Sequence, residues 1–146
     1  MEKSVELKEK FMDAFGLEEQ DLRTYSPLTL AYLGDAVFEL IVRTVLVERK
    51  NTQPEKLHKA ATKIVKAETQ ARMIEFLKED LTEEELAVYK RGRNAKAVTR
   101  AKNATMSEYR RATGFETLMG YLYLKGDTER MIELIHEGVK RAEVVL

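Results

Sequence analysis

Three charged side chains, spaced four residues apart in an otherwise apolar segment, are the first place to look for chemistry. Between positions 28 and 47 the only charged residues are Asp35, Glu39 and Arg43. This spacing places all three on one stripe of a helix. Burial of a carboxylate is costly unless a cation or hydrogen bonds compensate it. We therefore expect this stripe to carry a functional group.

A second carboxylate is isolated in another apolar stretch. Glu116 is the only acidic residue between Glu108 and Asp127. Two lone carboxylates on two mostly buried helices suggest one shared metal ion, because a cation offsets the desolvation of both. The alternative is that each carboxylate pairs with a nearby base, such as Arg43 or Arg110. The apolar residues around Glu116 have the spacing of a buried helical stripe: Tyr109, Ala112, Phe115, Leu118, Met119 and Leu122.

The composition restricts such a metal to one held by oxygen atoms. The sequence contains no cysteine and only two histidines, His58 and His136, which are far apart. This excludes disulfides, a thiol nucleophile and a metal centre built from cysteine or several histidines. Magnesium and manganese are the ions that prefer oxygen ligands. We interpret His58 as a helix-surface residue rather than a general base, because a metal-bound water needs no histidine.

The charges are unevenly distributed although their formal sum is zero. Residues 90–111 contain eight basic side chains against one acid, Glu108, whereas residues 79–85 contain five acids and no base. A local excess of positive charge is typical of a surface that binds the phosphates of a nucleic acid. The alternative is a solvated loop whose charge serves solubility.

Apolar spacing and capping residues predict an all-α protein. No segment alternates with the period of a strand. Ser26 before Pro27 indicates one helix start, and Thr82 three residues before Glu85 forms a capping box at another. Thr52 with Glu55 predicts a further capping box, and Gly126 indicates a helix end. The predicted helices cover residues 3–15, 27–49, 54–66, 68–79, 83–92, 107–125 and 128–143, with a long loop from Gly92 to Met106.

The chain has the size of one compact domain, 146 residues of which 44% are hydrophobic. The segment 1–25 is predicted to be an N-terminal helical extension. The helix at 27–49 has no broad polar face, which predicts a core helix that also contributes to a dimer, and its three central charges argue against a membrane span. Without a basic and apolar leader we expect a cytoplasmic protein. The extension presents one apolar face for packing: Leu7, Phe11, Ala14 and Phe15.

Three segments together resemble the catalytic domain of ribonuclease III. They are LAYLGDAVFELIVR at 30–43, LHKAATKIVKAETQA at 57–71 and YRRATGFETLMGYLYL at 109–124, in the family's order and spacing. The run KRGRNAK at 90–96, together with the lack of a following double-stranded-RNA-binding domain, resembles the bacterial mini-ribonuclease III subfamily. We therefore expect residues 26–146 to form a ribonuclease III-like catalytic domain.

The resemblance implies a homodimeric, all-helical endoribonuclease that cuts double-stranded RNA with Mg²⁺, or with Mn²⁺, and leaves 5′-phosphate and 3′-hydroxyl ends. The subfamily implies maturation of the large-subunit (23S) ribosomal RNA precursor, with a ribosomal protein as a candidate helper. By the family's motifs, Asp35 and Glu116 are the catalytic carboxylates that bind the metal. Glu39 is expected in the shell behind them, where it orients a coordinated water or pairs with a base.

RNA recognition is expected to follow the shape and backbone of the duplex, because A-form RNA hides its base edges in a deep major groove. The basic loop is expected to supply the main contacts, with two arginines near the metal and two lysines as outer phosphate contacts. The main contacts are Arg91, Arg93, Asn94 and Lys96. The arginines near the metal are Arg110 and Arg111, and the outer phosphate contacts are Lys59 and Lys63.

Two positions depart from the family pattern. Full-length ribonucleases III usually carry acids where this chain has Ala31 and Thr113. The departure favours a rival hypothesis, a catalytically inactive ribonuclease III-like domain that serves as an RNA-binding scaffold on the ribosome. Retention of Asp35 and Glu116 argues against that scaffold, because an inactive protein has no reason to retain two carboxylates whose burial destabilises the fold. A helical adaptor without RNA activity is a third hypothesis, which the basic cluster disfavours.

Overall fold

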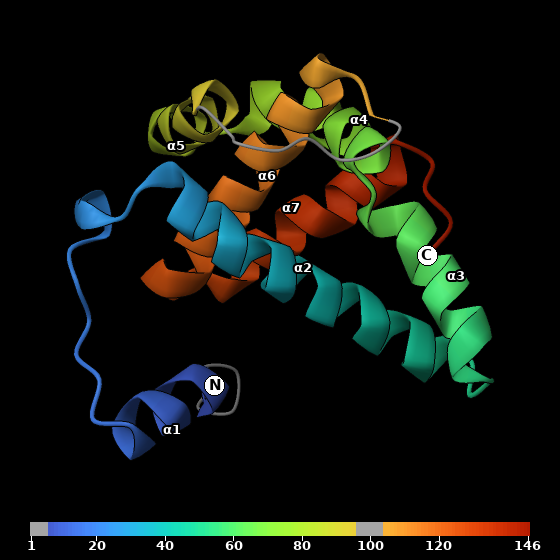
Figure 1. Cartoon of the computed structure of the whole chain (residues 1–146), viewed down its shortest axis with the longest axis horizontal. Coiled ribbons are helices and arrows are strands. Elements are labelled where there is room, and N and C mark those ends of the chain that lie inside the picture. Colours follow the sequence, from blue (N-terminus) through green and yellow to red (C-terminus); the bar gives the residue numbers. More distant parts are fainter. Residues whose placement is uncertain (1–5, 96–103) are drawn as a thin grey trace.

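The computed structural model describes residues 6–95 and 104–146, and every regular element in these ranges is a helix (Figure 1). The predicted all-α class is therefore confirmed. No helix in this part of the chain is long and apolar enough to cross a membrane. The elements, in chain order, are α1 (Glu6–Ala14), η2 (Leu22–Thr24), α2 (Pro27–Arg49), α3 (Pro54–Val65), α4 (Ala67–Leu77), η3 (Lys78–Asp80), α5 (Glu83–Asn94), α6 (Met106–Lys125) and α7 (Thr128–Arg141).

Three helix ends, the starts of α2 and α5 and the end of α6, are fixed by the capping residues that the sequence indicates. The Ser26 hydroxyl accepts a hydrogen bond from the backbone N–H of Thr29 at 3.1 Å. Thr82 and Glu85 form the expected capping box, with bonds of 3.0 and 3.1 Å. Gly126 ends α6 in the left-handed conformation, with φ of 83°.

Two local predictions, one about a cap and one about a helix end, are wrong. α3 is capped by Gln53 without a side-chain bond, so the predicted box of Thr52 and Glu55 does not form. α5 continues to Asn94, so Gly92 lies in a helix rather than in a loop. A Cβ atom on Gly92 would lie 2.6 Å from the Cβ of Thr117, so the glycine is required by close packing of α5 on α6.

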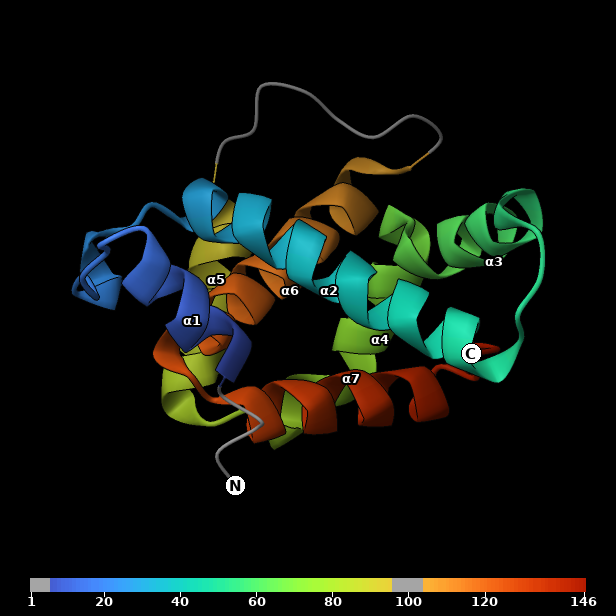
Figure 2. The same cartoon turned by 90° about the horizontal axis from the view of Figure 1, so that it is seen from below.

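The central element is α6, which packs against α2, α5, α4 and α7 (Figures 1 and 2). Its closest crossing is with α2. A Cβ atom on Gly34 of α2 would overlap the carbonyl oxygen of Glu116 and lie 2.7 Å from the backbone nitrogen of Gly120. A Cβ atom on Gly120 would in turn overlap the carbonyl oxygen of Leu30. The two glycines therefore allow the backbones of α2 and α6 to touch.

The core between these helices is aromatic at its centre. Phe38 of α2 and Phe115 of α6 are fully buried, and their rings meet edge to face with centroids 5.2 Å apart. This geometry is favourable for aromatic pairs. The pair lies one turn from Asp35 on one helix and next to Glu116 on the other, so the core holds both carboxylates in place.

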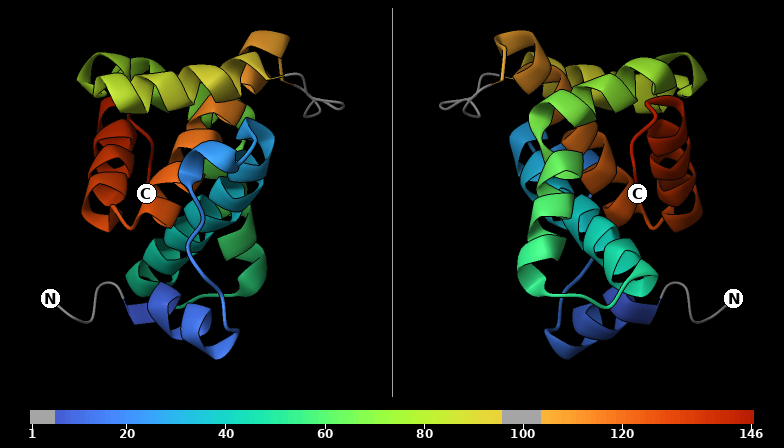
Figure 3. Two further views of the ribbon diagram at one scale, coloured as in Figure 1. Left: turned by 90° about the vertical axis from the view of Figure 1, so that its left-hand side faces the viewer. Right: turned by 90° about the vertical axis from the view of Figure 1, so that its right-hand side faces the viewer.

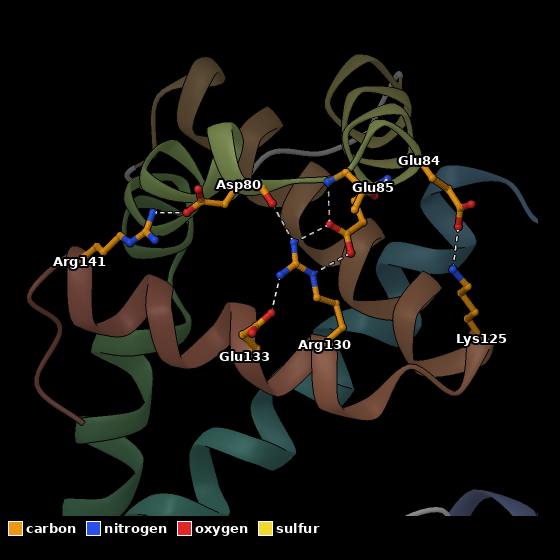
Figure 4. A network of polar contacts seen from close by, with 8 residues as sticks. Asp80, Glu84, Glu85, Lys125, Arg130, Glu133 and Arg141 are labelled. Atoms are coloured by element: carbon orange, nitrogen blue, oxygen red, sulfur yellow. Dashed lines mark hydrogen bonds and ion pairs between the residues drawn. The ribbon is translucent and has the colours of Figure 1, made fainter.

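A polar network ties the start of α5 to α7 (Figure 4). Arg130 donates to both carboxylate oxygens of Glu85, at 2.8 and 2.9 Å, to the carbonyl of Asp80 at 2.8 Å, and also to Glu133. These bonds lower the pKa of Glu85, which is only 5% exposed. Arg141 pairs with Asp80 at the other end of α7. Since buried ion pairs with satisfied hydrogen bonds resist separation, the network fixes where α5 presents its basic last turn.

The N-terminal helix α1 lies at the edge of the molecule (Figure 3). The prediction that its apolar face packs against the chain is wrong. Leu7 and Phe15 are 67% and 77% exposed. The side that faces the chain carries Lys8, whose Nζ donates to the carbonyl of Leu124 at 2.6 Å, and the half-buried Met12. A polar anchor therefore replaces part of the expected apolar contact.

Candidate metal centre and RNA-binding surface

The side chains of Asp35 and Glu116 meet where α2 crosses α6. Burial, first of all, and the charge and contact of the neighbouring Asp35 carboxyl together raise the pKa of Glu116 to about 8. Two carboxyls so close cannot both ionise easily without a cation between them. The structure thus brings together the two acids that the sequence singles out.

Their environments differ from the predicted ones in one respect. Glu116 is mostly buried, whereas Asp35 is exposed on the outer side of α2. The prediction that Asp35 is buried is wrong for the single chain. Its side of α2 is uncovered, since Tyr32 and Ala36 are exposed there as well. α2 therefore carries apolar side chains on a face that the chain itself does not cover.

Gln70 is a third polar residue at the site, and sequence reasoning missed it. Its side chain is 1% exposed, and its Nε2 donates to Glu116 Oε2 at 3.2 Å and to the carbonyl of Val65 at 2.6 Å. Its Oε1 is buried without a hydrogen-bond partner in the described part of the chain. The available signal is that Gln70 begins an apolar stripe that continues with Met73, Ile74 and Leu77. An amide at the first position of such a stripe needs a polar partner.

The donor set fits a magnesium ion that keeps most of its water. Among residues 6–95 and 104–146 no group of three or more histidine, cysteine or acidic side chains could hold a metal, so Asp35 and Glu116 are two candidate ligands without a third. Magnesium is commonly bound by one or two carboxylates, with waters and substrate phosphates completing its shell. Ala31 contributes no ligand, and the Thr113 hydroxyl donates to the carbonyl of Tyr109 at 3.0 Å. A divalent cation between the two carboxyls would oppose the burial and the Asp35 charge that raise the pKa of Glu116.

A hollow of about 510 Å³ opens beside Glu116. Its walls come from the junction of α3 and α4 and from the first half of α6, and they include Gln70, Thr113 and Glu116. Lys66 lies at its edge, paired with Glu68 at 3.9 Å. The hollow gives a ligand access to the buried side of Glu116.

Glu39 and Arg43 form an ion pair with each other. Arg43 Nε donates to Glu39 Oε2 at 2.9 Å, and a second guanidinium nitrogen reaches the same oxygen. The alternative in which Arg43 neutralises Asp35 is therefore disfavoured. Arg110 has no hydrogen bond or ion pair within the described residues, so it does not neutralise Glu116 either.

The predicted RNA contacts fall into two groups. Arg93, Asn94, Arg110 and Arg111 line one hollow between the end of α5 and the start of α6. Arg91 is exposed nearby on α5, with a bond of 3.4 Å to the carbonyl of Tyr25. The second group is on α3, where both lysines are exposed: Lys59 and Lys63. Lys96 lies outside the described residues.

Comparison with known proteins gives the family of this fold and site. The family model described as the ribonuclease III domain matches residues 28–127, which include both carboxylates. The chain belongs to the ribonuclease III family of endoribonucleases. It is 50% identical to mini-ribonuclease 3 of Clostridium tetani, over 80% of this chain and 78% of that protein. It is 48% identical to mini-ribonuclease 3 of Enterococcus faecalis, over 84% of this chain and 94% of that protein.

A crystal structure of a Fusobacterium nucleatum protein has the same fold. It superposes with a TM-score of 0.76 at 33% identity, over 84% of this chain and 98% of that protein. The ribonuclease III match runs from the start of α2 to just after α6. It therefore contains the crossing that joins Asp35 to Glu116, the buried Gln70 and the basic end of α5, but not α1.

Proposed function

We propose that this ribonuclease III protein cleaves double-stranded RNA with Mg²⁺ or Mn²⁺ held by Asp35 and Glu116. The observation that supports this most is the contact of the Asp35 carboxyl with Glu116, which itself lines an accessible hollow. A divalent ion bound there would activate a water, position the scissile phosphate and stabilise the charge that develops on its oxygens. The expected products carry 5′-phosphate and 3′-hydroxyl ends.

The residues of the chain have separate roles in this proposal. Asp35 and Glu116 each offer a carboxylate oxygen to the ion. Gln70 holds Oε2 of Glu116 by a hydrogen bond, which leaves the other oxygen of Glu116 for the metal. The ion pair of Glu39 with Arg43 lies one turn along α2 and sets the local charge near Asp35.

The homodimer is proposed to form along the exposed face of α2. Leu28, Tyr32, Leu40 and Val47 are 38%, 83%, 56% and 50% exposed, and they follow one another along this helix. Apolar side chains in such a row are typical of a protein interface. A two-fold axis at α2 would place two copies of the Asp35–Glu116 pair near each other, which suits the two antiparallel strands of an RNA duplex. The segment 1–25 is proposed to be an extension outside the catalytic domain of residues 26–146.

The substrate is proposed to be the precursor of large-subunit (23S) ribosomal RNA in the cytoplasm, with a ribosomal protein as a helper. The similar proteins are named mini-ribonuclease 3, and the relevant sequence feature is the basic run at 90–96. The basic residues at the end of α5, with Lys59 and Lys63 on α3, are proposed to contact phosphates of the duplex.

A second function, an inactive RNA-binding scaffold, is favoured by one observation. Ala31 and Thr113 are buried where the family usually carries acids, so only two acids remain. Under this alternative the basic surface binds RNA, but the carboxylate pair has no catalytic role.

The two functions are separated by incubating the purified full chain with a long RNA duplex, with Mg²⁺ or with a chelator. We expect metal-dependent cleavage that falls about 100-fold or more in Asp35→Asn and in Glu116→Gln. Glu129→Gln, an exposed acid on α7, is the matched control and should cleave like the unmodified protein. Tight binding of the duplex without cleavage at any metal concentration would favour the scaffold.

A further inference from the structure

A second hollow lies on another side of α6. It has a volume of about 410 Å³ and is bounded by the ends of α4 and α5 and by the first turns of α6. Its lining contains four cations and no carboxylate: Lys78, Arg93, Arg110 and Arg111. Glu75 pairs with Lys78 at 3.3 Å and with Arg111 at 3.5 Å. Even with Glu75 counted against them, the cations leave a clear positive excess.

The tyrosine at this hollow has a buried hydroxyl without a partner. Tyr89 is 0% exposed, and its hydroxyl makes no hydrogen bond within residues 6–95 and 104–146. Its ring packs against Gly114 on one side, and the guanidinium of Arg93 lies 5.6 Å from the ring centroid. Burial raises the pKa of Tyr89 and the charge of Glu75 adds to this, whereas the charges of Arg93 and Arg111 and the closeness of the Arg93 side chain lower it. Tyr89 lines the hollow, so its hydroxyl has a proton to donate at this surface.

The start of α6 adds backbone donors to this surface. Met106 and Ser107 are the first two residues of the helix, and both line the hollow. The capping box uses only the backbone N–H groups of Thr105 and Glu108, so it leaves those of Met106 and Ser107 available. The first N–H groups of a helix have no acceptor within it, and the helix dipole favours negative charge there.

We propose that this hollow is a phosphate-binding site, in which Arg110, Arg93 and the first turn of α6 hold the anion and the Tyr89 hydroxyl donates to it. Phosphate fits because it offers several acceptor oxygens and a charge that balances the excess of cations. Arg110 is the central contact, since it has no other partner in the described chain. The phosphate is either a group of the RNA backbone or a free phosphate ion.

This site is separate from the carboxylate pair. Ser107 precedes Glu116 by nine residues, which corresponds to about 14 Å along α6 and about half a turn around it. The two hollows therefore open on different sides of the same helix. A phosphate bound at the start of α6 is not the one that the metal would hold for cleavage.

The test is thermal unfolding of the full chain in a chelator, with inorganic phosphate titrated at constant ionic strength against chloride. We expect phosphate to raise the melting temperature of the unmodified protein, because a ligand that binds only the folded state stabilises it. Tyr89→Phe and Arg110→Gln should each weaken the apparent phosphate affinity about tenfold. Tyr89→Phe removes only an unpartnered hydroxyl, so its unliganded form should be at least as stable as the unmodified protein. The matched controls, Tyr123→Phe and Arg49→Gln, should respond to phosphate like the unmodified protein.

A second measurement distinguishes the two sources of the phosphate. Binding of an RNA duplex is measured in chelator. If inorganic phosphate and Arg110→Gln both weaken this binding, the occupant is an RNA phosphate. If neither inorganic phosphate nor Arg110→Gln changes the binding of the duplex, the occupant is a free phosphate ion. An absence of phosphate-specific stabilisation, or the same stabilisation in both site variants and the controls, would overturn the proposal. The phosphate titration needs neither a divalent metal nor cleavage, so its failure is distinguishable from failure of the endoribonuclease proposal.

Discussion

Gly34 and Glu116 are in direct backbone contact, since a Cβ atom on Gly34 would overlap the carbonyl oxygen of Glu116. Asp35 follows Gly34 in the chain, so this contact delivers the first carboxylate to the second. The meeting of the two acids is therefore a consequence of how closely two helices approach, and side-chain rearrangement alone could not produce it.

The first prediction concerns this contact. Gly34→Ala should destabilise the protein by about 1–3 kcal/mol, because the added methyl group forces α2 away from α6. On an open helix surface the same change would be stabilising, since alanine is the better helix former. Chemical denaturation measures the difference. Gly138→Ala is the control: its Cβ would lie 3.1 Å from the flexible ends of Leu77 and Met73, so a much smaller loss is expected. Equal losses in the two variants would contradict the close crossing.

The second prediction concerns pH. The pKa of Glu116 is raised from 4.5 to about 8 in the metal-free fold, so the folded state binds more protons than the unfolded state between these values. Stability is therefore greatest below about pH 4.5 as far as this group is concerned, and it is lost as the pH rises to about 8. Glu116→Gln should remove about 1–3 kcal/mol of this decline.

The measurement is the free energy of unfolding in chelator at pH 5 and pH 8. Glu129→Gln serves as the control and should keep the full decline. Mg²⁺ at pH 8 should restore stability to the unmodified protein but not to Glu116→Gln. A decline that is unchanged in Glu116→Gln would show that the two carboxyls do not share a strained site.

The third prediction concerns Gln70. Gln70→Leu should weaken Mn²⁺ binding about tenfold, because the hydrogen bond that orients Glu116 is lost. The binding can be followed by the electron paramagnetic resonance signal of the free ion, which does not depend on cleavage. Gln53→Leu changes an exposed glutamine that makes no capping bond, and it should bind Mn²⁺ normally. Unaltered affinity in Gln70→Leu, with the fold intact, would leave Gln70 a structural residue only.

The fourth prediction concerns the basic end of α5. The double variant Arg91→Gln with Arg93→Gln should bind an RNA duplex more weakly, and the slope of log affinity against log salt should fall by about 1–2. Arg49→Gln with Lys50→Gln removes the same number of charges from the far end of α2, and its slope should not change. A slope that is unchanged in the α5 variant would remove Arg91 and Arg93 from the RNA interface.

Local signals made most of the fold predictable. Caps such as Ser26 and the Thr82 box act within one turn, so the sequence alone indicates where their helices begin. The two catalytic candidates were also predictable, because Asp35 and Glu116 are isolated acids on apolar helices. Their isolation suggested a shared metal ion, and the resemblance to ribonuclease III added that they are the catalytic carboxylates.

Features that depend on tertiary packing were not predictable in the same way. Gly92 has the composition of a loop, but contact with Thr117 keeps it in α5. The exposure of Asp35 depends on what covers the outer face of α2, which apolar spacing does not specify. The bond from Gln70 to Glu116 joins residues 46 positions apart, and no local pattern contains that information.

The most direct test of the metal centre is a crystal of the full chain grown with Mn²⁺ and measured for the anomalous signal of the ion. The expected result is one peak within bonding distance of carboxylate oxygens of both Asp35 and Glu116. A peak that contacts only one of the two, or that lies elsewhere while both carboxyls are empty, would contradict a shared metal site.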